Sequence, residues 1–370
     1  MLRFKSTILS LIAATFLVSS MAFAQTPTPT KPKPKDDDEI IKVSSRLVVV
    51  PVSVTDASGN AVTGLTAKDL KITEEGRPQQ IENLGTADVV PLEIALLFDV
   101  SASTDAMFKF EQETAARFLN GVMRPNDRAS IFTIGQKGVL LQPRDTAEKS
   151  MATIRSITPT KEQTAFYDSV RTAADYLNRN APEGVRKVIV IISDGEDTNS
   201  DGVIKAIWEA ERKITDDIQG PKLRELRVKA RDAAKLSEQG KVLKSLQNAD
   251  TVFYSINPGG SSYQLNSMSV FGQSNMQRFA DETGGTAFLP KFQPIDTKNY
   301  LENELNTRKN QELLEQIFRQ LANELRSQYL IQYYSDADFP LNKFVKVEVS
   351  LPTRPAVRVR ARQGYYVKNN

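Results

Sequence analysis

The sequence predicts an α/β protein in which a doubly wound, mostly parallel sheet is inserted into a smaller β-sandwich built from both chain ends. Between about residues 91 and 291, nearly continuous apolar runs alternate with amphipathic stretches. This alternation is typical of parallel strands that are covered by helices on both faces. Short strand-and-turn patterns precede this region and return after it, as expected for a sheet structure that the central region interrupts.

The first residues predict an export signal rather than a part of the fold. Arg3 and Lys5 precede an apolar run at 8–18, and an Ala-Phe-Ala sequence occupies 22–24. A basic start, a short apolar core and an A-x-A end are typical of a secretory signal peptide. The run is shorter than the roughly 20 residues that span a bilayer. We therefore expect residues 1–24 to be removed and the mature chain to be exported, periplasmic or secreted, without a transmembrane segment.

Composition excludes several kinds of chemistry. The chain has no Cys, so it has no disulfides and no thiol for a lipid anchor. It has no His, which removes the commonest general base and the commonest zinc ligand. Without residues 1–24 the formal net charge falls from +3 to +1, because two basic residues are lost. Such a balance gives no indication of nucleic-acid binding.

The two ends of the mature chain predict a linker and two sets of strands. Residues 25–42 are rich in Pro, Lys and Asp and predict an extended linker. Residues 43–88 and 328–370 predict the N-terminal and C-terminal parts of one β-sandwich. Near the end of the chain, three arginines alternate with apolar residues, at Arg358, Arg360 and Arg362. This row is either the solvated face of a strand or a docking surface for an anion.

The central domain is predicted at 89–297, followed by a connecting helix at 298–327. Strands are predicted at 92–98, 129–134, 139–142, 187–193, 251–256 and 286–289. Helices are predicted at 108–123, 147–157, 165–178 and 275–283. The stretch at about 202–247, called the insert below, has amphipathic spacing with room for two or more helices between two predicted strands. It is either a helix pair that packs on its own body or an element that selects a partner.

Oxygen-bearing side chains follow the first buried strand. Asp99, Ser101 and Ser103 form an Asp-x-Ser-x-Ser sequence at the carboxyl end of this strand, the edge at which open α/β sheets bind ligands. Thr164 precedes a predicted helix, and Asp194 follows a second apolar strand. Oxygen donors of this kind suit a hard divalent cation. Alternatively, a loop rich in Asp and Ser only caps the next helix.

These segments together resemble the metal-ion-dependent adhesion site of von Willebrand factor A domains, which have a Rossmann-like sheet. The resemblance implies that Ser101 and Ser103 touch the metal directly and that Thr164 binds directly or through water. It also implies that Asp99 and Asp194 act mainly through bridging waters. The implied ion is Mg²⁺, with Mn²⁺ or Ca²⁺ as alternatives. One coordination position is left for an Asp or Glu carboxylate of a partner protein.

Further segments resemble an exported bacterial family that is described only as related to von Willebrand factor A. The resemblance covers most of the mature chain and indicates the fold, but it brings no biochemical role. The segments that carry it include Leu47-Val48-Val49-Val50-Pro51-Val52, Ala280-Asp281-Glu282-Thr283-Gly284-Gly285, Ser327-Gln328-Tyr329 and Arg362-Gln363-Gly364-Tyr365-Tyr366.

These observations favour an exported, metal-dependent protein-binding or adhesion module that is not an enzyme. The main alternative is a metal-dependent hydrolase or phosphatase. Against it, Ser101 stands where an Asp-x-Asp phosphatase motif places its second carboxylate, and a Ser nucleophile has no His as its base. A further alternative is an envelope scaffold whose metal site is empty.

Overall fold

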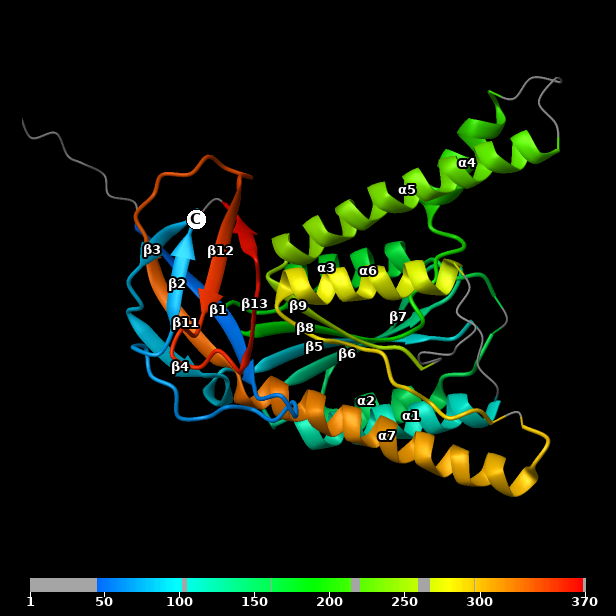
Figure 1. The fold of residues 1–370 in the computed structure, drawn as a ribbon, viewed down its shortest axis with the longest axis horizontal. Coiled ribbons are helices and arrows are strands. Elements are labelled where there is room, and N and C mark those ends of the chain that lie inside the picture. The colour runs from blue at the N-terminus through cyan, green and yellow to red at the C-terminus, as the bar shows by residue number, and fades with distance from the viewer. Residues whose placement is uncertain are drawn as a thin grey trace, which may run out of the picture. The chain divides into compact units, whose positions relative to one another are not determined.

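The computed structural model describes residues 45–101, 105–160, 162–213, 220–258, 267–295 and 297–368. Within them, a mostly parallel sheet with helices on both faces is joined to two antiparallel four-stranded sheets (Figure 1). The predicted fold class is therefore confirmed. The predicted signal peptide and linker, Ser103 and the middle of the predicted insert lie outside the described residues.

A six-stranded sheet in the order β10-β9-β8-β5-β6-β7 forms the centre of the α/β region. All neighbours are parallel except β7, which runs antiparallel to β6 at one edge. The strands β5, β8 and β9 are almost wholly buried, which explains their continuous apolar sequences. The six strands are β5 (Leu92–Asp99), β6 (Arg128–Ile134), β7 (Gly138–Asp145), β8 (Arg186–Ile192), β9 (Thr251–Ile256) and β10 (Ala287–Phe288).

Helices bury their apolar stripes against both faces of this sheet. On one face Leu119, Ile154 and Leu321 bring α1, α2 and α7 into one core. On the other face Val170 and Val242 belong to a second core, to which α3, α5 and α6 contribute. The helices are α1 (Asp105–Val122), α2 (Ala147–Ser156), α3 (Phe166–Asn180), α4 (Asp201–Glu211), α5 (Pro221–Asn248), α6 (Ser267–Thr283) and α7 (Tyr300–Ser327).

The two antiparallel sheets combine strands from both ends of the chain. Their orders are β13-β1-β11-β4 and β14-β12-β2-β3, so β1 pairs with β11 and β13, and β2 pairs with β12. A short 3₁₀ helix, η1 (Ala87–Val89), leads from β4 to the central sheet. The strands are β1 (Arg46–Thr55), β2 (Lys71–Glu74), β3 (Arg77–Gln79), β4 (Asn83–Thr86), β11 (Tyr329–Ser335), β12 (Phe344–Ser350), β13 (Arg358–Ala361) and β14 (Gly364–Tyr366).

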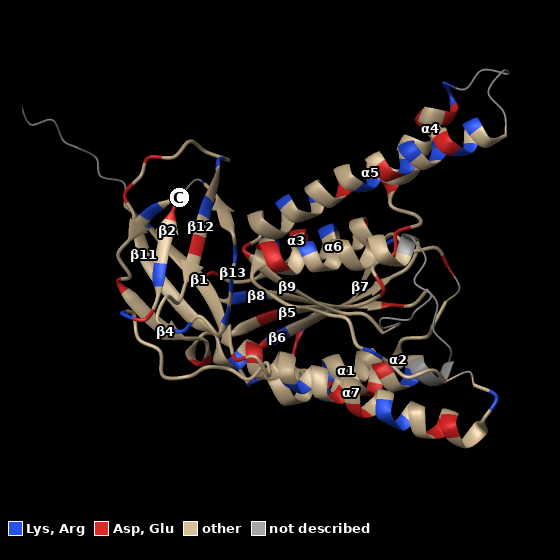
Figure 2. Cartoon of the chain, in the orientation of Figure 1, with Lys and Arg blue, Asp and Glu red and all other residues tan. Residues whose placement is uncertain are grey.

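The insert forms the helix pair α4 and α5. Gly202 allows the start of α4 to approach α5, because a Cβ there would lie 2.0 Å from a side-chain oxygen of Glu238. Buried residues of α5 begin at Ala234, so the first part of this helix packs mainly on α4. Both helices carry charges of both signs along their lengths (Figure 2). Trp208, on α4, is 62% exposed.

The elements that differ from the sequence-based expectation include β14, α6 and β7. The short strand β14 was not predicted, because three residues carry too little pattern. The helix α6 begins earlier than predicted, because its first turns contain Ser, Gly and Asn, which are weak helix formers. The strand β7 is longer than predicted and is paired irregularly with β6. Within the described residues, no helix combines the length and apolarity that a membrane span requires.

A buried carboxylate holds the sandwich core together. Glu74, which is 2% exposed, accepts hydrogen bonds from the hydroxyls of Tyr333, Tyr365 and Ser335 at 2.8, 2.7 and 2.7 Å. Glu74 comes from the N-terminal strands and the three hydroxyls from the C-terminal strands. The network therefore links the two chain ends.

We expect Glu74→Ala to lower the free energy of unfolding by about 3 kcal/mol or more, because it leaves three hydroxyls in the core without their acceptor. Urea unfolding checks this value. Glu82→Ala, at an exposed position without a side-chain partner among the described residues, is the matched control and should change little. Equal effects of the two variants would contradict the role of the network.

Candidate metal centre

The loops that carry the predicted ligands meet at the carboxyl edge of the central sheet. Asp99 is the last residue of β5, and Phe98 pairs with Ile192 at the end of β8, so the loops of Asp99 and Asp194 begin side by side. The loop before α3 crosses the same edge. It is held there by Thr160 N–H, which donates to the carbonyl of Val100 at 2.6 Å.

The carboxylate of Asp99 accepts three hydrogen bonds. One carboxylate oxygen accepts from the backbone N–H and the hydroxyl of Ser101, at 3.0 and 2.6 Å. The other oxygen accepts from the hydroxyl of Ser193 at 2.7 Å. Burial raises the pKa of Asp99 despite these hydrogen bonds, and the charge of Glu196 raises it further. A positive charge at this position would relieve both effects.

Thr164 is 6% exposed and is fixed by its backbone. Its N–H donates to the hydroxyl of Thr198 at 2.8 Å, and its carbonyl accepts from the N–H groups of Thr198 and Asn199 at 2.9 and 3.0 Å. Its own hydroxyl has no hydrogen-bond partner among the described residues. The backbone thus ties this loop to the loop of Asp194, while the Thr164 hydroxyl is left for a ligand.

Asp194 lies just beyond β8, and its carboxylate accepts from the N–H of Glu196 at 2.9 Å. Burial raises the pKa of Asp194 to about 6, with further contributions from the charges of Asp99 and Glu196. The next residue, Gly195, has a φ of 74° and touches Gly272 of α6, where a Cβ on either glycine would clash with the other's backbone. This close approach packs α6 against the Asp194 loop.

The structure thus brings Asp99, Ser101, Thr164 and Asp194 to one edge, while Ser103 lies outside the described residues. The sequence analysis missed Ser193, which orients Asp99, and Glu196, whose charge acts on both aspartates. Ser193 carried a weak signal, because a polar residue at the end of an apolar strand faces the ligand edge. No sequence signal marked Glu196, apart from its place in an acidic loop.

The donor set fits a hard divalent cation. Asp99 and Asp194 form no ion pair with Lys or Arg among the described residues. No basic side chain in this part of the chain therefore compensates the negative charges of the two carboxylates. All available donors are carboxylate or hydroxyl oxygens, which suit Mg²⁺. No group of three or more Asp, Glu, His or Cys side chains is placed to hold a metal among the described residues. The predicted site requires only two carboxylates, because its remaining donors are hydroxyls.

A third carboxyl group lies behind this edge. Glu111 of α1 is 4% exposed, and burial, with a further contribution from the charge of Asp99, raises its pKa from 4.5 to about 8. Between pH 4.5 and about pH 8, the Glu111 carboxyl group keeps its proton in the folded protein but has lost it in the unfolded chain. The free energy of unfolding therefore decreases as pH rises through this window.

We expect Glu111→Gln to remove this pH dependence. Between pH 5 and pH 9, the free energy of unfolding of wild type should decrease by a few kcal/mol more than that of the variant, since each pKa unit corresponds to about 1.4 kcal/mol. Urea unfolding in EDTA at both pH values measures the difference. Mg²⁺ should reduce it, because a cation near Asp99 offsets the charge that acts on Glu111. Parallel pH profiles of the two proteins would contradict the assignment.

A comparison with known protein families finds a match for part of the central α/β domain. Residues 94–196 match the von Willebrand factor type A domain, whereas none of the curated proteins matches the chain. Among solved structures, an aerotolerance-related membrane protein from Bacteroides fragilis is 16% identical, over 60% of this chain and 98% of that chain, with a TM-score of 0.31. BatB from Bacteroides thetaiotaomicron is 13% identical, over 60% and 96%, with a TM-score of 0.31.

A third similar structure is proximal thread matrix protein 1 from the mussel byssus, with a zinc-occupied MIDAS motif. It is 12% identical, over 68% of this chain and 50% of that chain, with a TM-score of 0.36. This chain thus spans half the length of the mussel protein. In the present chain, the matched segment begins in β5, ends just after β8 and contains all five predicted ligands. The chain therefore contains a von Willebrand factor type A domain, inserted between the two halves of a β-sandwich.

Proposed function

We propose that this protein is an exported metal-dependent protein-binding or adhesion module, periplasmic or secreted, and not an enzyme. Asp99, Ser101, Ser103, Thr164 and Asp194 hold Mg²⁺, or Mn²⁺ or Ca²⁺ in its place. One coordination position receives an Asp or Glu carboxylate from a partner protein. One observation supports this proposal most strongly: two buried carboxylates without a basic partner lie with hydroxyl donors at one edge of the sheet.

The balance of charge supports a carboxylate as the incoming ligand. Two aspartates balance a divalent cation formally, but Ser and Thr hydroxyls are weak donors, so the ion remains electrophilic. A partner carboxylate supplies a stronger oxygen donor than water. A cavity of about 970 Å³ begins at Val100 and extends past Thr160 and Asn199, which gives room for partner residues beside this position.

The alternatives predict different behaviour. In a hydrolase or phosphatase, a Ser nucleophile at this site would need a base, and without His that base would have to be a Lys or a carboxylate. A scaffold with an empty metal site would not respond to Mg²⁺. Assays of phosphatase and esterase turnover, together with metal titration, separate the three functions.

We expect Mg²⁺ to stabilise the wild-type protein against heat, because an ion that binds only the folded state stabilises it. The free energy of unfolding increases by about 2.7 kcal/mol when the Mg²⁺ concentration is a hundredfold above the dissociation constant. Thermal melts at pH 7.5 with Mg²⁺ and with EDTA measure it, at a pH where Asp194, with a pKa of about 6, is ionised. Asp99→Asn should abolish the difference.

Glu183→Gln is the matched control for this measurement. Glu183 is an exposed acidic residue on the loop after α3 and has no side-chain partner among the described residues. Its loss should leave the effect of Mg²⁺ unchanged. Coinciding melts of wild type with millimolar Mg²⁺ and with EDTA would count against the metal site.

The helix α4 starts beside the candidate site and is positioned to select a partner. The N–H of its first residue, Asp201, donates to Asp168 of α3 at 2.7 Å, and the preceding loop holds Thr164. Trp208 lies further along α4 and is exposed. Any carboxylate is attracted to a cation, so discrimination between partners must come from such neighbouring surface.

We expect Trp208→Ala to weaken partner capture while leaving the Mg²⁺-dependent shift of the melt intact. Capture is compared with Mg²⁺ and with EDTA, using an envelope extract of the native organism. Trp208 is the chain's single Trp, so a captured partner, once isolated, should also shift the Trp emission of wild type. Unchanged capture by the variant would show that the insert is only scaffold.

A further inference from the structure

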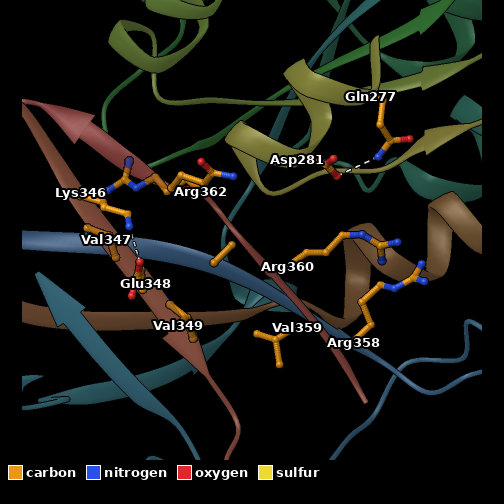
Figure 3. Close-up of a pocket in the computed structure, with 12 residues that line it drawn as sticks. Gln277, Asp281, Lys346, Val347, Glu348, Val349, Arg358, Val359, Arg360 and Arg362 are labelled. Atoms are coloured by element: carbon orange, nitrogen blue, oxygen red, sulfur yellow. Dashed lines mark hydrogen bonds and ion pairs between the residues drawn. The ribbon is translucent and has the colours of Figure 1, made fainter. Parts of the chain in front are cut away.

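A second cavity, of about 740 Å³, lies between β12, β13 and α6 (Figure 3). None of the predicted metal ligands that the structure describes lines it. The wall from α6 contains Gln277 and Asp281, and β12 contributes Val347 and Val349. The volume lies within the range of roughly 300–1,000 Å³ that is usual for small-molecule sites.

Two of the basic residues that line this cavity already have partners. Arg362 forms an ion pair with Asp250 and donates to the carbonyl of Val49 at 2.7 Å. Lys346 pairs with Glu348 at 2.5 Å. The contacts of Arg362, whose side chain is 13% exposed, fix it in the structure, whereas Lys346 and Glu348 form an exposed surface pair.

Arg358 and Arg360 differ from these residues. Neither forms a hydrogen bond or an ion pair with any of the described residues. They are two residues apart on β13, so their Cα atoms are about 7 Å apart and their side chains share one face. Figure 3 shows both side chains extending to the same side of the strand, with Val359 on the other side. Basic residues recur along this strand (Figure 2).

The opposing charge available to these two guanidinium groups is small. Glu324 of α7 is near enough that Arg360 lowers the pKa of its carboxyl, but burial raises that pKa by more. Glu324 is 3% exposed and its carboxylate already accepts from the hydroxyl of Thr286 at 3.0 Å. The lining also contains two carboxylates, but Asp281 accepts from Gln277 at 2.8 Å and Glu348 pairs with Lys346, and neither forms an ion pair with Arg358 or Arg360.

The cavity is built by fixed contacts rather than by a gap between loops. The N–H of Gln363 donates to the carbonyl of Glu282 at 3.1 Å, and Thr283 forms a β-bridge with Arg362. Gly284, with a φ of 85°, lets the end of α6 approach β13, because a Cβ there would lie 2.7 Å from the carbonyl carbon of Ala361. The walls are therefore held at a set separation.

We propose that this cavity is a ligand site for a small molecule that carries two acidic groups, carboxylate or phosphate. The guanidinium groups of Arg358 and Arg360 each offer the planar pair of N–H donors that matches such oxyanions. Val349 of β12, which is only partly buried, adds an apolar side chain to the lining. Asp281, on the opposite wall, accepts from a hydroxyl or an amine of the ligand.

Isothermal titration calorimetry with citrate and with pyrophosphate tests this proposal. The titrations use the full chain, freed of metal beforehand on a chelating resin, at constant chloride concentration, so that binding of either anion through a metal is excluded. Wild type should bind at least one of them, and the preferred anion distinguishes a carboxylate ligand from a phosphate ligand. Arg358→Gln should weaken binding about tenfold, the usual effect of losing one charge-assisted hydrogen bond. Arg358→Gln with Arg360→Gln should weaken it further.

The matched control combines Arg308→Gln with Arg354→Gln. Both residues are exposed and lie outside the cavity lining, so the control removes the same charge and should bind as wild type does. Arg358 is itself exposed, so its single variant remains a valid test even if the double variant does not fold. Absence of binding to both anions, equal binding by wild type and Arg358→Gln, or equal loss in the control would overturn the proposal.

Discussion

The burial of two neighbouring carboxylates is the constraint on which the candidate metal centre depends. Asp99 and Asp194 end adjacent parallel strands, and burial raises the pKa of each. Removing a charged group from water is costly unless it gains partners. Ser101 and Ser193 supply hydrogen bonds to Asp99, but hydrogen bonds from neutral hydroxyls do not cancel two negative charges. A cation beside the two carboxylates would offset both charges.

The rest of the α/β region keeps this edge in place. The strands β5 and β8 are buried by helices on both faces, so the positions at which they end are set by packing. The loop of Thr164 is bound to the loop that follows Asp194 through backbone groups. The contact of Gly195 with Gly272 adds α6 to the same assembly. Rigid loops of this kind hold oxygen donors ready for an ion and reduce the ordering that binding requires.

Much of this arrangement was predictable, because it follows from continuous patterns. Apolar strands between amphipathic helices specify a parallel sheet, and its carboxyl edge then places Asp99 beside Asp194. Glu111 was not predictable, since an acidic residue on an amphipathic helix gives no sign that tertiary packing will bury it. The cavity at Arg358 could not be predicted from the sequence either. The arginine row was visible, but its enclosure by α6 depends on the close approach at Gly284, which no local pattern encodes.

The arginine cavity lies beside the edge of the central sheet that is opposite to the candidate metal centre. Arg362 is held by Asp250, directly before β9, whereas the metal ligands follow the strand ends on the other side. The six residues of β9 separate these edges by about 20 Å. Any coupling between them must pass through packed elements such as α6, which contacts both edges.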